Sequence, residues 1–372
     1  MMDKDIKILV ISNMFPSSKY PSYGVFVENF CKQLTENNIS FKLICMNKTQ
    51  SKLYKVFRYI KFMLSAFVWC LFGKYDYIYI HYLSISSIPV LLASHFKELK
   101  VISNAHGSDF APENKKQERC QKYTKHILRI SEKIVVPSEY FKVYAQQKYG
   151  VELLNKKIYV YPSGGINKAI FYPMNETQIE YLHSKYNLEK GNIYYGYCGR
   201  ISAQKGIDTL LKAAQLVLKK QKNIRFIIVG NGEYEKDMDL LINKLEIEQY
   251  IIRLPLLPQN QLAEIYNLIN AFIFPTERDG ESLGLVAIEA MACGNIVIAS
   301  DYGAPKYYIE HGVNGYKFEK GNFEELASIL LLLTNNDMIY KKMSYEALKT
   351  ADAYTTQNTV KKMIKIFQEA YE

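Results

Sequence analysis

Two glutamates separated by seven residues, Glu281 and Glu289, are the most informative chemical feature of this 372-residue sequence. Glu289 stands in an otherwise apolar segment that predicts a helix beginning near Leu283 and ending at Cys293. A carboxylate inside an apolar helix is costly unless it has a partner, and a ribose diol would supply one. The free amides of Leu283 and Gly284 would face a diphosphate. Glu281, which precedes the helix, would reach past the diphosphate toward a sugar.

Two cations lie at another expected junction between a strand and a helix. Arg200 and Lys205 follow a strand directly and precede a helix that begins near Gly206. Helix amides together with two cations form a strong diphosphate site, although a surface loop with two solvated charges fits these residues equally well. A second glycine loop, Gly230-Asn-Gly-Glu, contains Gly232 and follows the next strand. A tight turn explains this loop nearly as well as a ligand does.

The composition and the charge indicate a globular protein with one basic half. Hydrophobic residues make up 48% of the chain and charged residues 23%, and the net charge is +10. Residues 1–170 carry an excess of 13 positive charges, whereas the remainder carries an excess of three negative charges. No helix-turn-helix, zinc or RNA-binding signature accompanies the basic half, so we expect no nucleic-acid partner. An anionic membrane surface or a phosphate-bearing acceptor fits better.

Two basic helices are expected in the first half. The first contains Lys52, Lys55, Arg58 and Lys61 among aliphatic and aromatic residues, and the second contains Lys115, Arg119, Lys122, Lys125 and Arg129. Such helices bind anionic membrane interfaces, and the alternative is an ordinary amphipathic helix with a solvated basic face. The longest apolar run, Phe62–Gly73, would form about 18 Å of helix. We therefore predict no transmembrane span, because the hydrocarbon core is about 30 Å thick.

The six cysteines are scattered, with no CxxC pair and no histidine at metal-ligand spacing. Buried thiols in a reducing cytosol explain them. No Asp-x-Asp sequence or His/Cys cluster is placed to hold a catalytic cation, so we expect neither a metal nor another cofactor. No signal peptide is visible, which favours a cytoplasmic location.

Short apolar runs that alternate with helical patterns must position these residues. The first series of expected strands is Ile6–Ser12, Phe41–Met46, Asp76–Ile80, Lys100–Asn104, Ile134–Val136 and Ile158–Tyr161; the second is Ile193–Cys198, Arg225–Val229, Ile251–Leu254, Ala271–Phe274 and Ile296–Ala299. Continuous apolar runs are typical of parallel sheets that are buried on both faces. A turn-rich linker begins at Tyr161. The sequence thus predicts two doubly wound α/β domains with ligands outside the carboxyl ends of the strands.

Several motifs together resemble one enzyme family over the whole chain. Glu281 and Glu289 resemble the EX7E signature of the family-four retaining glycosyltransferases, which have the GT-B fold. The supporting motifs are Gly199-Arg200 with Lys205-Gly206, Val229-Gly-Asn-Gly, Val135-Val-Pro-Ser and Pro162-Ser-Gly-Gly-Ile-Asn-Lys-Ala-Ile-Phe. The sequence departs from the family pattern at Ala304-Pro-Lys-Tyr and at Asn167, which stands in place of Asp.

The resemblance implies two Rossmann-like doubly wound parallel-sheet domains that face a cleft. Residues 1–165 would form the acceptor and membrane-side domain, and residues 166–352 the nucleotide-sugar domain. Residues 353–372 would form a helix that crosses back to the first domain. The implied donor-binding residues are Gly24, Arg200, Lys205, Gly232, Ser282, Leu283, Gly284 and Glu289. The implied catalytic residues are Glu281 at the transferred sugar and His106 across the cleft.

Three side chains in the first domain remain open to a structural interpretation. His106 is either a site residue, as the resemblance implies, or a satisfied structural histidine. His81, directly after an expected strand, is a weaker candidate for the site. Asp109 is expected to support the loop that contains His106.

The implied activity is transfer of a sugar from a UDP- or GDP-sugar, with retention of configuration and without a metal. The implied acceptor is a glycan or a polyprenyl-diphosphate-linked sugar at the inner face of the cell membrane, in bacterial surface polysaccharide biosynthesis. The alternatives are a nucleotide-sugar epimerase of the same fold and a non-catalytic sugar-nucleotide-binding subunit. A Rossmann dehydrogenase is disfavoured, because the first strand is followed by Asn13-Met-Phe-Pro instead of GxGxxG.

Overall fold

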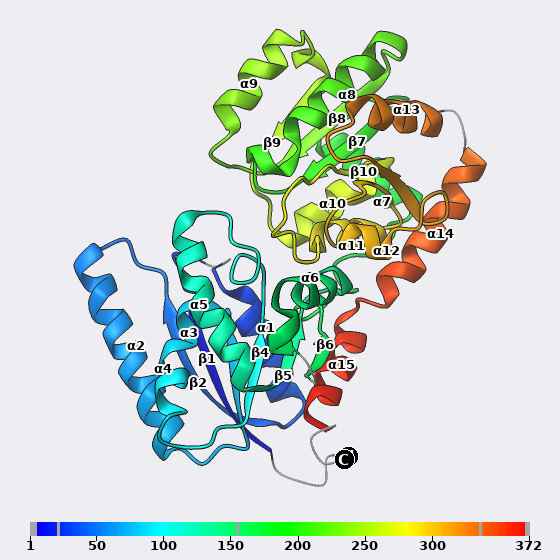
Figure 1. The fold of residues 1–372 in the computed structure, drawn as a ribbon. Coiled ribbons are helices and arrows are strands. Elements are labelled where there is room, and N and C mark those ends of the chain that lie inside the picture. Colours follow the sequence, from blue (N-terminus) through cyan, green and yellow to red (C-terminus); the bar gives the residue numbers. More distant parts are fainter. Residues whose placement is uncertain (1–5, 21–22, 154–155, 335–336, 369–372) are drawn as a thin grey trace. The chain divides into compact units, whose positions relative to one another are not determined.

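The computed structural model describes residues 6–20, 23–153, 156–334 and 337–368. The chain forms two compact units. The first comprises Met1–Gly164 and Thr359–Glu372, and the second comprises Gly165–Asn358 (Figure 1).

The first unit is built on a six-stranded parallel sheet in the order β2-β1-β3-β4-β5-β6. The strands are β1 (Lys7–Phe15), β2 (Ser40–Asn47), β3 (Tyr77–His81), β4 (Val101–Asn104), β5 (Ser131–Val136) and β6 (Lys157–Val160). The helices are α1 (Val25–Glu36), α2 (Lys52–Phe72), α3 (Leu83–Ser86), α4 (Ile88–Ala93), α5 (Lys115–Ile130), α6 (Glu139–Tyr149) and the 3₁₀ turn η1 (Gly150–Leu153). Each expected strand of this half is present, with ends that differ by up to three residues.

Consecutive residues of β1 contact two different cores. Ile8 and Val10 pack with Tyr79 on one face of the sheet, whereas Leu9 and Ile11 pack on the other face. All five side chains are fully buried. Because side chains alternate along a strand, a sheet covered on both faces produces the continuous apolar run that the sequence shows.

The last helix, α15 (Thr356–Gln368), contributes to the first unit although it begins in the second. Met363, Ile366 and Phe367 are fully buried in the core that contains Phe30 of α1. The Nζ of Lys133, in β5, donates a hydrogen bond of 2.5 Å to the carbonyl of Ile366. The end of the chain is thus an integral part of the first unit's core.

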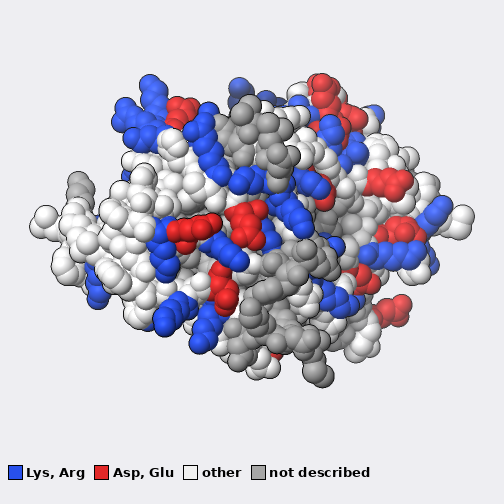
Figure 2. Space-filling model, turned by 60° about the horizontal axis from the view of Figure 1, so that its bottom comes forward, with Lys and Arg blue, Asp and Glu red and all other residues white. Residues whose placement is uncertain are grey.

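Helix α2 buries only one narrow stripe. Phe62, Ala66 and Cys70, spaced four residues apart, are buried against the sheet. Four neighbouring side chains are partly buried against the same core: Tyr59, Met63, Phe67 and Leu71. The other large apolar side chains of α2 are exposed by 38–86%: Leu53, Tyr54, Val56, Phe57, Ile60, Leu64, Val68, Trp69 and Phe72. Figure 2 shows a broad area almost free of charge at the end of the molecule where α2 and α4 lie, with Lys and Arg at its margins. The exposed side of α2 is therefore largely apolar, which differs from the alternative of an ordinary solvated basic face, and membrane binding stays a prediction.

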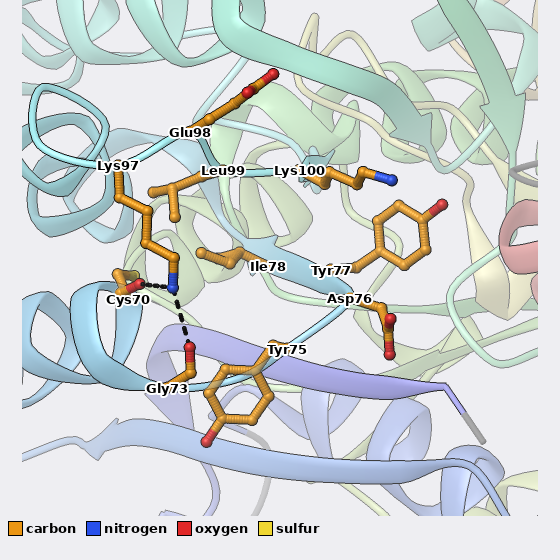
Figure 3. A pocket seen from close by; sticks show the side chains of 10 residues that line it. All are labelled: Cys70, Gly73, Tyr75, Asp76, Tyr77, Ile78, Lys97, Glu98, Leu99 and Lys100. Atoms are coloured by element: carbon orange, nitrogen blue, oxygen red, sulfur yellow. Dashed lines mark hydrogen bonds between the residues drawn. The ribbon is translucent and has the colours of Figure 1, made fainter.

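The C-terminal end of α2 is capped by a cation. The Nζ of Lys97 donates hydrogen bonds to the carbonyl of Leu71 at 3.1 Å and, as Figure 3 shows, to that of Gly73 at 3.0 Å. A cation at this end also interacts favourably with the helix dipole. The adjoining cavity of about 260 Å³ lies where β3 and β4 begin, opposite the edge at which parallel sheets bind ligands. None of the described helices combines the length and the apolarity that a membrane span needs.

The second unit contains another six-stranded parallel sheet, in the order β12-β11-β10-β7-β8-β9. The strands are β7 (Ile193–Cys198), β8 (Ile224–Val229), β9 (Ile251–Leu254), β10 (Ala271–Phe274), β11 (Ile296–Ser300) and β12 (Gly315–Phe318). The helices are α7 (Glu176–Lys185), α8 (Ile207–Lys220), α9 (Glu235–Lys244), α10 (Gln259–Leu268), α11 (Leu285–Ala292), α12 (Pro305–Tyr308), α13 (Phe323–Leu333) and α14 (Asp337–Asp352), with the 3₁₀ turns η2 (Ala203–Lys205) and η3 (Glu248–Tyr250).

The prediction of two doubly wound parallel sheets is confirmed. The edge strand β12 was not predicted. It has four residues, it begins with Gly315, and it contains Lys317 between apolar neighbours, so it lacks a continuous apolar run. It lies at the edge of the sheet, beside β11.

Candidate active site

In the second unit, the residues selected from the sequence follow strands at one edge of the sheet. β7 leads to Arg200 and Lys205, β8 leads to Gly232, and β10 leads to Glu281. Because the sheet is parallel, the carboxyl ends of these strands lie at the same edge, where open α/β sheets bind ligands. Glu289 enters from α11, which follows the β10 loop.

Two of these loops touch through their backbones. Gly206 has a φ of 71°, and a Cβ at this position would lie 1.8 Å from the carbonyl oxygen of Pro275. Close to this contact, the amide of Glu277 donates a hydrogen bond of 2.9 Å to the carbonyl of Gln204. Any side chain at Gly206 would force the loops apart. This glycine therefore fixes Lys205 beside the loop that contains Glu281.

Lys205 and Glu281 form an ion pair in an enclosed place. The Nζ of Lys205 donates a hydrogen bond to Oε2 of Glu281. The Oγ1 of Thr276 lies 3.3 Å from the same oxygen. The side chains of the pair are only 15% and 9% exposed. The sequence analysis gave these residues separate roles, at the diphosphate and at the sugar, whereas the structure joins them directly.

Glu289 is a buried carboxyl in an apolar environment. It is 4% exposed, and its helix neighbours Ile288 and Ala290 are fully buried. Burial raises the pKa of Glu289 to about 7, and the nearby hydroxyl of Tyr266 acts in the opposite direction. Cys198, at the end of β7, also faces it, since the Glu289 charge contributes to the raised pKa of that thiol after burial itself. The raised pKa thus reflects the energetic cost that was predicted for an ionised carboxylate at this position.

The helix that contains Glu289 starts later than predicted. α11 begins at Leu285, and Gly284 precedes it with a φ of 71°. The left-handed turn at Gly284 ends the loop abruptly, so Ser282 and Leu283 belong to the loop. The other end of the helix agrees with the prediction, because Cys293 is its C-terminal boundary.

Arg200 lies on the surface and has an acidic partner. Its Nε and Nη2 each lie 2.9 Å from Oε2 of Glu233, and the two side chains are 71% and 60% exposed. The pKa of Glu233 is lowered, mainly by a hydrogen bond to its own backbone and further by Arg200. Arg200 and Lys205 therefore differ in character, because only Lys205 is enclosed.

The glycines after β8 have a structural role of their own. A Cβ on Gly230 would lie 1.9 Å from the carbonyl oxygen of Gly199, and one on Gly232 would lie 2.0 Å from that of Ile201. The amide of Gly232 donates a hydrogen bond of 2.6 Å to Glu235. Close packing of the β7 and β8 loops therefore explains these glycines. Donor binding by Gly232 stays a prediction.

Two polar residues near Glu281 were missed by the sequence analysis. Thr276 directly follows Pro275 and shares the Glu281 oxygen with Lys205. Tyr308, in α12, is 8% exposed, and its hydroxyl has no hydrogen-bond partner among the described residues. Burial raises its pKa well above the usual value, and the Glu281 charge adds to this shift after that of Tyr354. A tyrosine carries no sequence signal that separates this position from the many others in the chain.

In the first unit, His106 and His81 contact each other at the carboxyl ends of β4 and β3. The Nδ1 of His81 lies 2.9 Å from Nε2 of His106, and Phe26 stacks on the His106 ring at 3.9 Å. Burial lowers the pKa of His106 to about 3 and that of His81 well below its usual value, with a further contribution from His106. Both rings are therefore neutral at physiological pH.

The second nitrogen of His81 indicates which histidine donates. Its Nε2 is buried and has no hydrogen-bond partner among the described residues. A buried N–H without a partner is rarer than a buried acceptor without one. We therefore assign the proton of His81 to Nδ1, which donates to His106 Nε2. This tautomer gives His106 an Nδ1–H donor. His81, which the sequence made a weak candidate, orients His106.

Asp109 supports the His106 loop, as expected. Its carboxylate accepts hydrogen bonds from the amides of Leu83 at 3.0 Å, His106 at 3.0 Å and Gly107 at 2.8 Å. Burial raises the pKa of Asp109, and these bonds act in the opposite direction. The carboxylate is thus occupied by the protein backbone.

Gly24 precedes α1 with a φ of 81°, and a Cβ there would lie 2.6 Å from the backbone of Met14. This contact explains the glycine within the first unit, and its approach to donor phosphates stays a prediction. Across the described ranges, no group of three His, Cys, Asp or Glu side chains could hold a metal ion.

Residues 178–350 match the family model of the glycosyl transferases group 1. An uncharacterized glycosyltransferase of Methanocaldococcus jannaschii is 24% identical over 97% of this chain and 99% of its own length. The capsular polysaccharide biosynthesis glycosyltransferase CapM of Staphylococcus aureus is 27% identical over 50% of this chain and 49% of its own length.

The fold has a close counterpart among solved structures. The crystal structure of HepE from Anabaena in complex with UDP superimposes with a TM-score of 0.75 at 17% identity, over 98% of this chain and 100% of that one. The family match falls on the second unit, which contains Lys205, Glu281 and Glu289. Residues 178–350 are therefore similar to the group 1 glycosyltransferases, and the chain has a two-domain GT-B fold.

Proposed function

We propose that this protein is a glycosyltransferase that transfers a hexose-type sugar from a UDP- or GDP-sugar to a glycan or lipid-linked acceptor, with retention of configuration and without a metal. The enclosed pair of Lys205 and Glu281 supports the proposal, because a cation and a carboxylate lie together at the edge where open α/β sheets bind ligands. Glu289, in the helix that follows the Glu281 loop, supplies a second carboxyl group for the donor.

The charged groups match the parts of a nucleotide sugar. The Lys205 ammonium would neutralise the charge that develops on the departing diphosphate, and Arg200 would exchange its surface partner Glu233 for a phosphate oxygen. The Glu289 carboxylate would accept hydrogen bonds from the ribose hydroxyls. Glu281 would position the sugar and stabilise its developing positive charge. Protein cations would thus serve where other enzymes use a metal.

Retention is best explained by a reaction on one face of the sugar. A double displacement needs a carboxylate nucleophile on the opposite face. Asp109, the acidic candidate from the first unit, has its oxygens committed to three backbone amides. We therefore favour attack from the same face, in which the departing diphosphate helps to take the acceptor proton. His106 would contribute a neutral N–H donor to the sugar.

The relatives and helix α2 support a proposed biological setting. Likeness to the capsular polysaccharide enzyme supports a role in bacterial surface polysaccharide biosynthesis. The exposed apolar face of α2, flanked by Lys55 and Lys61, supports peripheral binding to an anionic membrane at the cytoplasmic side. A polyprenyl-diphosphate-linked acceptor would be presented on that surface.

Replacing Lys205 with alanine should weaken binding of UDP or GDP at least about tenfold, because a charge-assisted hydrogen bond contributes roughly 1.5–3 kcal/mol. Arg200→Ala should have a smaller effect, since that side chain is exposed. Titration calorimetry measures both. Lys219→Ala, at an exposed lysine of α8, is the control. The double variant Lys205→Ala with Glu281→Gln separates lost phosphate binding from an unpaired Glu281. Unchanged nucleotide affinity in all these variants would rule out the assignment.

The raised pKa of Glu289 predicts opposite effects of pH on stability and on binding. Below the pKa of the unfolded chain, Glu289 is protonated in both states and does not reduce the stability of the folded protein. Above its folded-state pKa of about 7, the carboxyl is ionised in both states, and its burial reduces the free energy of unfolding by the full amount. Glu289→Gln removes this penalty, which is on the order of 3 kcal/mol. The variant should therefore gain thermal stability over the wild type at about pH 8 and show little gain at about pH 4.

Ribose hydroxyls prefer the ionised carboxylate as acceptor. The wild-type affinity for UDP-glucose or GDP-mannose, whichever binds, should therefore rise with pH through 7, whereas Glu289→Gln should bind weakly at every pH. These sugar esters lack the terminal phosphate that titrates in free UDP. A wild-type affinity that is flat across this range contradicts a ribose contact at Glu289.

Glu281→Gln should strongly reduce turnover while nucleotide affinity stays equal or increases, since Lys205 loses its competing partner. Proton NMR of the first product formed should show the anomeric configuration of the donor, in buffer that contains EDTA. An inverted product excludes retention, and full activity of Glu281→Gln removes that residue from the mechanism.

Activity that EDTA abolishes and Mg²⁺ restores excludes the metal-free proposal. Conversion of the donor alone into an epimer would indicate the epimerase instead.

Membrane binding should depend on both the apolar and the basic side chains of α2. Replacing Leu53, Phe57 and Leu64 with serine, or Lys55 and Lys61 with glutamate, should reduce co-sedimentation with anionic vesicles. High salt should weaken wild-type binding by screening. Leu240→Ser, at a 68% exposed leucine of the second unit, is the control. A wild type that stays in the supernatant at low salt shows that α2 does not bind membranes.

A further inference from the structure

Tyr308 places a buried hydroxyl beside the loop that contains Glu281. The side chain is 8% exposed, and its hydroxyl has no hydrogen-bond partner among the described residues. The hydroxyl lies close to Gly284, because a Cβ on this glycine would lie 3.1 Å from the hydroxyl oxygen. A buried polar group without a partner is costly and uncommon in folded proteins. No contact within the described part of the chain therefore accounts for this hydroxyl.

Several contacts hold the Tyr308 ring in this position. Tyr308 ends the short helix α12, and its carbonyl accepts a hydrogen bond of 2.8 Å from Nδ2 of Asn314. The ring of Tyr354 meets the Tyr308 ring edge to face, with 5.9 Å between the centroids. The segment before α12 packs on the Glu281 loop, since a Cβ on Gly303 would lie 3.5 Å from the Cβ of Glu281. The fold thus fixes the hydroxyl next to this loop.

The hydroxyl belongs to the same cluster as the ion pair. A Cβ on Gly284 would also lie 3.0 Å from the ring of Phe274, and the Nζ of Lys205 lies 5.7 Å from the centroid of that ring. Burial is the main cause of the raised pKa of Tyr308, and the charge of Glu281 contributes to it. The hydroxyl is therefore close enough to Glu281 to respond to its charge.

Two other hydroxyls near Glu281 already have acceptors. The hydroxyl of Tyr197 donates a hydrogen bond of 3.1 Å to the carbonyl of Arg200. The Oγ1 of Thr276 lies 3.3 Å from Oε2 of Glu281 and is already its partner. Of these three hydroxyls, only that of Tyr308 has no acceptor among the described residues. It is therefore the one that is available to a displaced carboxylate.

Resting on the proposed function, we propose that Tyr308 is a positioning residue whose hydroxyl donates to the Glu281 carboxylate when a donor diphosphate draws Lys205 away. Without a replacement partner, Glu281 would become a buried charge that has lost its cation, which is strongly unfavourable. A hydrogen bond from a hydroxyl to a carboxylate offsets part of this loss. The exchange would keep Glu281 ionised and ordered while Lys205 serves the leaving group.

Tyr308→Phe, which removes only the hydroxyl, should weaken binding of UDP or GDP, whichever the wild type binds, about tenfold in titration calorimetry. The melting temperature without nucleotide should stay equal or rise, because the variant removes a buried hydroxyl that has no partner. Tyr195→Phe is the matched control. The Tyr195 hydroxyl donates at 2.6 Å to the carbonyl of Leu330, so this variant should lose thermal stability and keep its nucleotide affinity.

A double-mutant cycle identifies the group on which the hydroxyl acts. In the Glu281→Gln background the carboxylate is absent, so Tyr308→Phe should change nucleotide affinity by no more than about threefold. An equal loss of affinity in both backgrounds, or an unchanged affinity of the single variant Tyr308→Phe, overturns the proposed exchange. A lower melting temperature with unchanged affinity, the pattern of Tyr195→Phe, shows a structural role instead. A wild type that binds neither UDP nor GDP contradicts the proposed function itself, so the two failures are distinguished.

Discussion

The candidate site of the second unit depends on the backbone contact between Gly206 and Pro275. Two loops from different strands can approach this closely only because Gly206 has no Cβ. Their contact brings Lys205 of one loop to Glu281 of the other. Neither charge could remain so enclosed alone, because burial of a single unpaired charge is costly. The glycine and the ion pair are therefore one structural unit, although they are far apart in sequence.

The three buried carboxyl groups, of Asp109, Glu281 and Glu289, differ in the groups that compensate their charge. Asp109 is compensated by three backbone amides, and Glu281 is compensated by Lys205. Glu289 lacks a comparable cation or set of amides in the described contacts, and its pKa is raised to about 7 as a result. Asp109 thus holds its loop in place, the contacts of Glu281 involve its Oε2, and Glu289 retains most of its hydrogen-bonding capacity for a ligand. This contrast agrees with a ribose contact at Glu289 and with the absence of a nucleophilic role for Asp109.

Sequence patterns predicted the strands, which depend on local sequence. They did not predict contacts between residues that are distant in the sequence. Strands such as β7 and β10 were predicted with their observed bounds, because buried parallel strands are continuous apolar runs. The start of α11 was displaced by two residues, since the sequence does not show that Gly284 is left-handed. The contact of His81 with His106 joins residues 25 apart through neighbouring strands, and no spacing rule predicts it. The left-handed backbone of Tyr82, with a φ of 59°, is likewise not predictable from the sequence.

The apolar residues of helix α2 face both the core of the first unit and its surface. Its basic and apolar residues predicted an interfacial helix, but the same pattern also fits a helix packed against a sheet. The structure separates these uses by position. Phe62, Ala66 and Cys70 are buried against the sheet, Met63, Phe67 and Leu71 are partly buried beside them, and the outer apolar residues are exposed. A helix that needed only to cover the sheet could have a polar outer face. Exposing apolar residues there reduces solubility unless another surface covers them, and the neighbouring lysines favour an anionic one.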